Sequence, residues 1–134
     1  KKNADAWNGK GIALEKSGFQ KQAIECYEVC INLDKKEPYG WNNIGGCLIQ
    51  LGQYKKAIKV YNKAIKLDRK YAFAWNGKGA AFRHLRQYKK AIVSFDKAIS
   101  LDEKLKLAWN GKGITLSDMG QYKKSIECFA KNLC

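Results

Sequence analysis

Side chains of the types that carry out covalent or metal chemistry are scarce in this sequence of 134 residues. It has one histidine, His84, and no recognisable motif places a serine or cysteine nucleophile with it. Its five cysteines form no CxxC pair: Cys26, Cys30, Cys47, Cys128 and Cys134. Cys26 and Cys30 would lie one helical turn apart, so a metal or redox pair is the alternative to small buried hydrophobic side chains. We expect no enzyme activity, no cofactor and no metal site, with His84 on the surface.

The charged residues are unevenly balanced, with 26 Lys and Arg against 12 Asp and Glu and a formal net charge of +14. Such an excess indicates either an anionic partner or a well-solvated surface. Asp34, Asp68 and Asp102 each follow a leucine at constant spacing, which favours a role in turns over acid–base catalysis. No apolar run approaches the roughly 20 residues of a membrane span, so we expect a soluble, cytoplasmic protein.

The elements that must position these residues follow from an internal repeat. Tryptophan recurs every 34 residues, at Trp7, Trp41, Trp75 and Trp109. The same step relates a glycine and an aromatic residue in each copy, namely Gly11, Gly45, Gly79 and Gly113, and Tyr27, Tyr61, Phe95 and Phe129. Within the second copy, apolar residues fall at helical spacing in 41–51 and again in 54–65. Each repeat is therefore predicted to be a pair of helices that needs its neighbours to bury a core.

With these residues the chain resembles the tetratricopeptide repeat family over its whole length. Three complete repeats cover 4–37, 38–71 and 72–105, and an incomplete fourth covers 106–134. The resemblance implies an all-α fold, a right-handed α-solenoid of antiparallel helix pairs in a single array. Because the sequence starts at Lys1 and stops at Cys134 inside a helical pattern, we interpret it as a piece of a longer chain.

Three local departures from the repeat lead to expectations about its turns. Gly18, Gly52 and Gly120 stand between paired helices, but Arg86 takes that place in the third repeat, so we expect a tighter or strained turn there. Phe19 replaces the glutamine found at Gln53, which predicts a different angle for the helix that follows. The family's proline between repeats is missing at three junctions, so a fused helix in a swapped dimer is the alternative to a break near Arg69 and Glu103.

The resemblance also implies a concave groove, lined by the first helix of each pair, that holds an extended or helical segment of a protein partner. The matching positions are Asn8, Ile12, Tyr39, Asn42, Asn43, Phe73, Asn76, Arg83, His84, Leu107 and Asn110. Asparagine follows every tryptophan, so Asn8, Asn42, Asn76 and Asn110 would form a ladder of amides able to bind a peptide backbone. The alternative is that this asparagine was inherited with the repeat or bonds to a neighbouring helix.

The same residues indicate which other classes of partner are expected. Relatives that clamp the C-terminal tail of a chaperone use lysines, asparagines and an arginine, and only Asn43 keeps the matching type, so a chaperone tail is not expected. The alternative function is a cationic module for an acidic protein or nucleic acid, which uses second-helix lysines such as Lys56 and Lys90 on the convex face. Nucleic acid is disfavoured because the aromatic side chains are committed to packing. Exposed Ile126, Phe129 and Leu133 predict end-to-end self-association.

Overall fold

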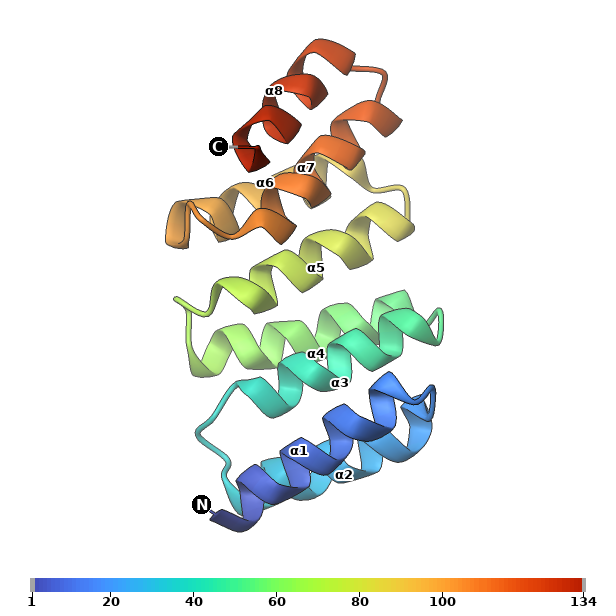
Figure 1. Cartoon of the computed structure of the whole chain (residues 1–134), viewed down its shortest axis with the longest axis vertical. Coiled ribbons are helices and arrows are strands. Elements are labelled where there is room, and N and C mark those ends of the chain that lie inside the picture. The colour runs from blue at the N-terminus through green and yellow to red at the C-terminus, as the bar shows by residue number, and fades with distance from the viewer. Residues whose placement is uncertain (1, 134) are drawn as a thin grey trace. The chain divides into compact units, whose positions relative to one another are not determined.

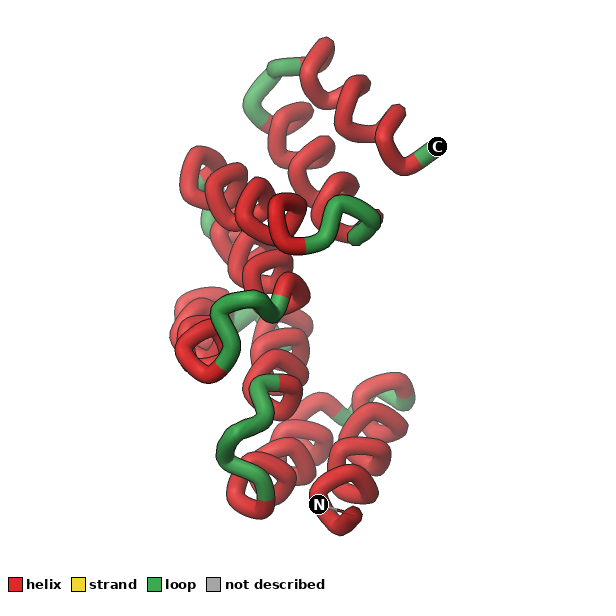
Figure 2. The backbone as a smooth tube through the Cα atoms, turned by 90° about the vertical axis from the view of Figure 1, so that its left-hand side faces the viewer, coloured by secondary structure: helices red, strands yellow, loops and turns green. Residues whose placement is uncertain are grey.

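The computed structural model describes residues 2–133, and these residues form eight helices and no strand (Figures 1 and 2). The helices are α1 (Lys2–Lys16), α2 (Gln20–Leu33), α3 (Tyr39–Gln50), α4 (Tyr54–Leu67), α5 (Ala72–His84), α6 (Tyr88–Leu101), α7 (Lys106–Asp118) and α8 (Tyr122–Asn132). They divide into two compact units, with unit 1 ending at Arg69 and unit 2 beginning at Lys70. Each unit holds two helix pairs, and we call α1, α3, α5 and α7 the A helices and their partners the B helices.

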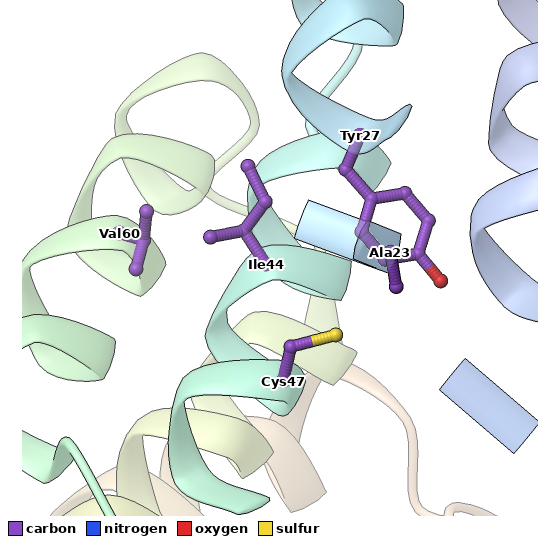
Figure 3. Close-up of a cluster of buried hydrophobic side chains, with 5 residues drawn as sticks. All are labelled: Ala23, Tyr27, Ile44, Cys47 and Val60. Carbon is purple, nitrogen blue, oxygen red and sulfur yellow. The ribbon is translucent and has the colours of Figure 1, made fainter. Parts of the chain in front are cut away.

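The paired helices are held close by a glycine that faces an aromatic ring. A Cβ atom added at Gly11 on α1 would lie 2.5 Å from Cε1 of Tyr27 on α2, and one added at Gly113 would lie 2.9 Å from Cε1 of Phe129. Tyr27 is buried, and it belongs to the unit 1 core cluster with Ala23, Ile44, Cys47 and Val60 (Figure 3). The repeat of small and aromatic residues therefore sets the spacing of the helices in each pair.

The turns inside the pairs share one backbone geometry. Gly18, Gly52 and Gly120 have φ values of 88°, 77° and 78°, and Arg86 has a φ of 62°. Gln87 N donates to Phe82 O at 2.9 Å in the third repeat, as Gln53 N donates to Leu48 O at 2.8 Å in the second. The turn at Arg86 is thus not tighter than the others. The strain expected there is confirmed, because an arginine adopts a left-handed conformation that glycine accepts more easily.

Phe19 does not change how α2 begins. Its φ and ψ are −99° and 64°, against −94° and 67° for Gln53 at the start of α4. The expected difference in angle is therefore wrong at the level of the backbone. The side chain of Phe19 is 53% exposed, and the backbone at the start of α2 is the same as at the start of α4.

The second and third junctions between repeats break the helices although they contain no proline. Helix α4 ends at Leu67 and α5 begins at Ala72, and α6 ends at Leu101 and α7 begins at Lys106. Asp102 Oδ1 accepts a hydrogen bond of 3.0 Å from Lys104 N, and Trp109 Nε1 donates one of 2.8 Å to Glu103 O. The predicted breaks near Arg69 and Glu103 are confirmed, and so is the turn role of Asp102.

Cys26, Cys30, Cys47 and Cys128 are buried free thiols, as expected of small hydrophobic side chains, and Cys134 lies outside the described residues. Burial raises the pKa of Cys30 and of Cys128. The thiols of Cys30 and Cys128 therefore stay protonated at neutral pH. Among residues 2–133, no three or more His, Cys, Asp or Glu side chains gather into a group able to hold a metal ion. No helix in this range is long and apolar enough to cross a bilayer.

Candidate functional site

The residues predicted to contact a partner all lie on A helices. In unit 1, α1 and α3 lie in front of α2 and α4 in the view of Figure 1. The unit 1 face consists of Asn8, Ile12, Tyr39, Asn42 and Asn43, and the unit 2 face consists of Phe73, Asn76, Arg83, His84, Leu107 and Asn110. We describe the two faces separately.

Two amides of the unit 1 face bond to each other. Asn43 Nδ2 on α3 donates to Asn8 Oδ1 on α1 at 2.8 Å, and this hydrogen bond is partly buried. The position of Asn43 is occupied by glycine in the other repeats, at Gly9, Gly77 and Gly111. Asn43 therefore departs from the repeat, and this departure is the sequence feature that could have predicted the pair. The oxygen of Asn8 is engaged within the fold, as in the alternative in which the asparagine bonds to a neighbouring helix.

The carboxylate of Glu15, near the end of α1, contacts buried side chains of unit 1. Tyr27 OH donates to Glu15 Oε1 at 2.8 Å. Burial first, and then this hydrogen bond and the negative charge of Glu15, raise the pKa of Tyr27. Burial together with the same carboxylate raises the pKa of Cys47 to about 12. Both groups stay neutral at pH 7, so this cluster supports the fold and offers no nucleophile.

Tyr39 and Ile12 differ in how far they reach solvent. Tyr39 is half-buried, and burial followed by its contact with Cys30 raises the pKa of Tyr39 to about 12. Ile12 is 37% exposed on α1. A hydrogen bond between the start of α2 and the end of α3 was not predicted from the sequence. There, Gln20 Nε2 donates to Gln50 Oε1 at 2.7 Å.

The unit 2 face is marked by two large apolar side chains in solvent. Phe73 on α5 is 48% exposed and Leu107 on α7 is 57% exposed. They occupy the same position in successive repeats. The Phe73 ring is tilted by 57° against the ring of Tyr71, with centroids 5.9 Å apart. Exposed apolar side chains that together form a patch commonly mark surfaces that another molecule covers.

The two amides of the unit 2 face differ in their partners. Asn110 Oδ1 accepts a hydrogen bond from Asn132 Nδ2 of α8, a residue that the sequence analysis did not single out. Asn76 Oδ1 is buried and has no hydrogen-bond partner among the described residues. Asn8 receives its hydrogen bond from Asn43, which lies 35 residues further along the chain. The same step from Asn76 leads to Gly111, which has no side chain, so Asn76 lacks that donor. An unpaired buried acceptor of this kind costs free energy unless something supplies a donor.

Charged side chains meet at the C-terminal end of α5. Arg83 Nη1 lies 3.6 Å from Asp118 Oδ2 and joins α5 to α7. His84 is exposed, as expected, and burial followed by the charge of Arg83 lowers its pKa. It is therefore neutral at pH 7. Arg83 and Asp118 thus offset each other's charge on the unit 2 face.

Comparison with known proteins places this geometry in a family. A family model described as tetratricopeptide repeat matches residues 38–71 and 72–105, and a second model with the same description matches 4–37 and 107–131. No curated protein sequence matches the chain.

Solved structures share the fold at low sequence identity. The crystal structure of MamA has a TM-score of 0.81 at 23% identity, covering 98% of this chain and 77% of that one. The Arabidopsis OM64 TPR domain has a TM-score of 0.81 at 23% identity, covering 87% and 97%. The first TPR of Spaghetti (RPAP3), solved bound to the HSP90 peptide SRMEEVD, has a TM-score of 0.81 at 24% identity, covering 89% and 94%. The fold is thus the all-α solenoid of helix pairs. Because the family matches together span nearly all of residues 4–131, the chain belongs to the tetratricopeptide repeat family.

Proposed function

We propose that this chain is a non-enzymatic scaffold whose A-helix faces bind an extended or helical segment of a partner protein. Tetratricopeptide repeats are protein-interaction scaffolds, and one solved relative is bound to a peptide. The observation that carries the proposal is the exposure of Phe73 and Leu107 at the same position of two successive A helices. Burying both side chains against a ligand would supply the main driving force for binding.

The amides would add hydrogen bonds to the peptide backbone. Asn8 and Asn110 have their oxygens engaged by Asn43 and Asn132, so Asn42 and Asn76 are the rungs best placed to serve a ligand. Asn76 Oδ1 lacks a partner among the described residues, and a rotation of its amide would let it accept from a peptide N–H. We therefore propose that Asn42 in unit 1 and Asn76 in unit 2 each bind a ligand on the face of their own unit.

A chaperone tail is not the partner we propose, although one relative binds an HSP90 peptide. Asn43 alone keeps the residue type of the carboxylate clamp, and its side-chain N–H already bonds to Asn8. The four buried thiols suit a reducing compartment, so we place the protein in the cytoplasm.

Selection from a displayed peptide library on this chain tests the proposal. The selected peptides should lose affinity by at least about tenfold when Phe73 and Leu107 are both replaced by serine, because two buried anchors are removed. Replacing Val93 and Tyr122, which are 67% and 65% exposed on B helices, by serine is the matched control. Equal losses in the two double variants would contradict binding on the A-helix faces.

The second candidate is a cationic module for an acidic protein or nucleic acid. Every one of ten B-helix lysines is exposed: Lys55, Lys56, Lys59, Lys63, Lys66, Lys89, Lys90, Lys97, Lys123 and Lys124. Nucleic acid remains the less favoured partner, because the four tryptophans are half-buried and offer few free faces for stacking. A salt titration separates the candidates, since polyanion binding weakens steeply with salt and apolar binding changes little.

Self-association is a further part of the proposal. On α8, Ile126 is 66% exposed and Phe129 is 37% exposed, and Leu133, which follows the helix, is 88% exposed. We propose that these side chains let chains associate end to end. Sedimentation should show mass rising with concentration, and a monomer at all concentrations would contradict this contact.

A further inference from the structure

A pocket on the B-helix side of unit 1 combines an apolar floor with a cationic rim. It has a volume of about 550 Å³ and lies between α2, α3 and α4. Ile31, Trp41 and Leu67 form its apolar part, and Leu67 is 42% exposed. The polar lining consists of Asn32, Lys35, Lys63 and Lys66. Its size falls within the range of about 300–1,000 Å³ that is usual for ligand sites.

The charged side chains that line this pocket are all positive. Three lysines line it, and no acidic side chain of the described residues does. Lys63 Nζ lies 4.5 Å from the centroid of the Trp41 ring, which holds the ammonium group over the apolar floor. An anionic group that entered the pocket would meet Lys63 beside the tryptophan, with Lys35 and Lys66 on the same lining.

The equivalent place in unit 2 shows that the repeat does not dictate this charge. A pocket of about 540 Å³ there is lined by Ile99, Trp109 and Lys131, the counterparts of Ile31, Trp41 and Lys63. Glu103 replaces Lys35, and Asp96 also lines the pocket. Lys112 Nζ lies 2.7 Å from Asp96 Oδ1. Two carboxylates thus line the unit 2 pocket beside two lysines, whereas no carboxylate within residues 2–133 lines the unit 1 pocket beside its three lysines.

We propose that this pocket, the Trp41 pocket, binds an acidic peptide segment of a partner protein. The segment inserts an aromatic or large aliphatic side chain against Ile31, Trp41 and Leu67. Carboxylates next to that anchor pair with Lys35, Lys63 and Lys66. The site is separate from the A-helix faces, so it gives the scaffold a second contact of different chemistry. This proposal rests on the cationic candidate function and assigns that function to one pocket and one kind of ligand.

The geometry favours a peptide over the other polyanions. Base stacking needs an open aromatic face, and Lys63 lies over the ring of Trp41, whereas a side-chain anchor can also pack on Ile31 and Leu67. A membrane surface takes up apolar side chains that project from a helix, and here Trp41 forms the floor of a pocket. An anchor side chain flanked by carboxylates matches both the floor and the rim, and anchors in pockets are the usual centres of binding energy.

The test uses this chain and a fluorescein-labelled pentapeptide, Asp-Glu-Phe-Glu-Asp, with binding followed by fluorescence anisotropy. Lys35→Glu gives unit 1 the residue of unit 2 and should weaken binding at least about tenfold, because a like charge replaces an attracting one. Lys104→Glu changes the net charge equally at an exposed turn of unit 2 and should leave the affinity within about twofold. Leu67→Ser should also weaken binding, and circular dichroism checks that each variant stays helical.

Several outcomes would overturn the proposal. These are absence of binding, equal losses in the Lys35→Glu and Lys104→Glu variants, and equal affinity for a peptide with alanine in place of phenylalanine. Tighter Lys35-dependent binding of an oligonucleotide or of anionic phosphatidylserine vesicles would assign the pocket to another partner. The Phe73 and Leu107 double serine variant should bind the pentapeptide normally, so failure on the A-helix faces remains distinguishable from failure here.

Discussion

The side chain of Asn43 on α3 donates a hydrogen bond of 2.8 Å to the side chain of Asn8 on α1. This bond ties successive A helices together in unit 1 at a position where the other repeats have glycine. It exists because one repeat departs from the pattern, and it removes one amide oxygen from the surface available to a ligand.

Replacing Asn43 by alanine should lower the free energy of unfolding by about 1 kcal/mol, because Asn8 Oδ1 then lacks its donor. Urea unfolding of Asn43→Ala, Asn8→Ala and the double variant measures the coupling between the two side chains. A coupling energy near zero would show that the bond contributes nothing to stability.

Gly11→Ala should destabilise the chain by roughly 1–3 kcal/mol, because the new methyl group meets the buried ring of Tyr27 at 2.5 Å. Gly9→Ala on the same helix has nothing within 4 Å and should stabilise it by roughly 0.5–1 kcal/mol. Thermal unfolding of both variants checks the pair, and a loss of stability in both would contradict the role of the ring.

Arg86→Gly should stabilise the chain by roughly 0.5–1 kcal/mol, because glycine adopts a φ of 62° with less strain than arginine. Lys36→Gly in the turn that follows α2 is the control and should not stabilise the chain, since Lys36 is not among the residues with positive φ. The measurement is the urea midpoint, and a lower midpoint for Arg86→Gly would count against this account.

Stability should fall as the pH rises above about 9, and the direction follows from the raised pKa values. Burial raises the pKa of Cys47 to about 12 and raises that of Tyr27 as well, so these groups ionise more readily in the unfolded chain. Their contribution is complete below the unfolded pKa values and is lost as the pH rises through the folded ones. Tyr27→Phe should make the decline between pH 9 and about pH 11 shallower.

Tyr122→Phe is the control for this pH series, because the Tyr122 ring is 65% exposed. Its decline in stability should match that of the unmodified chain. A Tyr27→Phe profile with the same slope as the control would show that Tyr27 plays no part in the alkaline loss of stability.

Asn42→Ala or Asn76→Ala should weaken binding of a selected peptide by roughly 1–3 kcal/mol, since a peptide group of the ligand loses its partner. The fold should stay intact, because alanine is a better helix former than asparagine. Lys56→Ala and Lys90→Ala should leave the affinity unchanged. If the lysine variants lose binding and the asparagine variants keep it, the partner binds the cationic surface.

The repeat and its helix pairs could be predicted from the sequence because they depend on short-range causes. A left-handed turn selects glycine at Gly18, Gly52 and Gly120, and the small residue at Gly11 must face the aromatic residue at Tyr27. The error at Phe19 has a local reason as well. The backbone of the turn before α2 determines how the helix begins, and the Phe19 side chain, which is 53% exposed, does not change that backbone.

The contacts that decide the candidate site came only from the tertiary structure. All four asparagines after tryptophan are alike in sequence, yet Asn8 and Asn110 are engaged and Asn76 Oδ1 is unpaired among the described residues. The hydrogen bond between Tyr27 and Glu15 was also found only in the tertiary structure. So was the difference in charge between the Trp41 pocket and its counterpart in unit 2. The physical reason is that a side-chain hydrogen bond or ion pair needs its atoms within a few ångströms. Packing between separate helices sets that distance, and the 34-residue period does not.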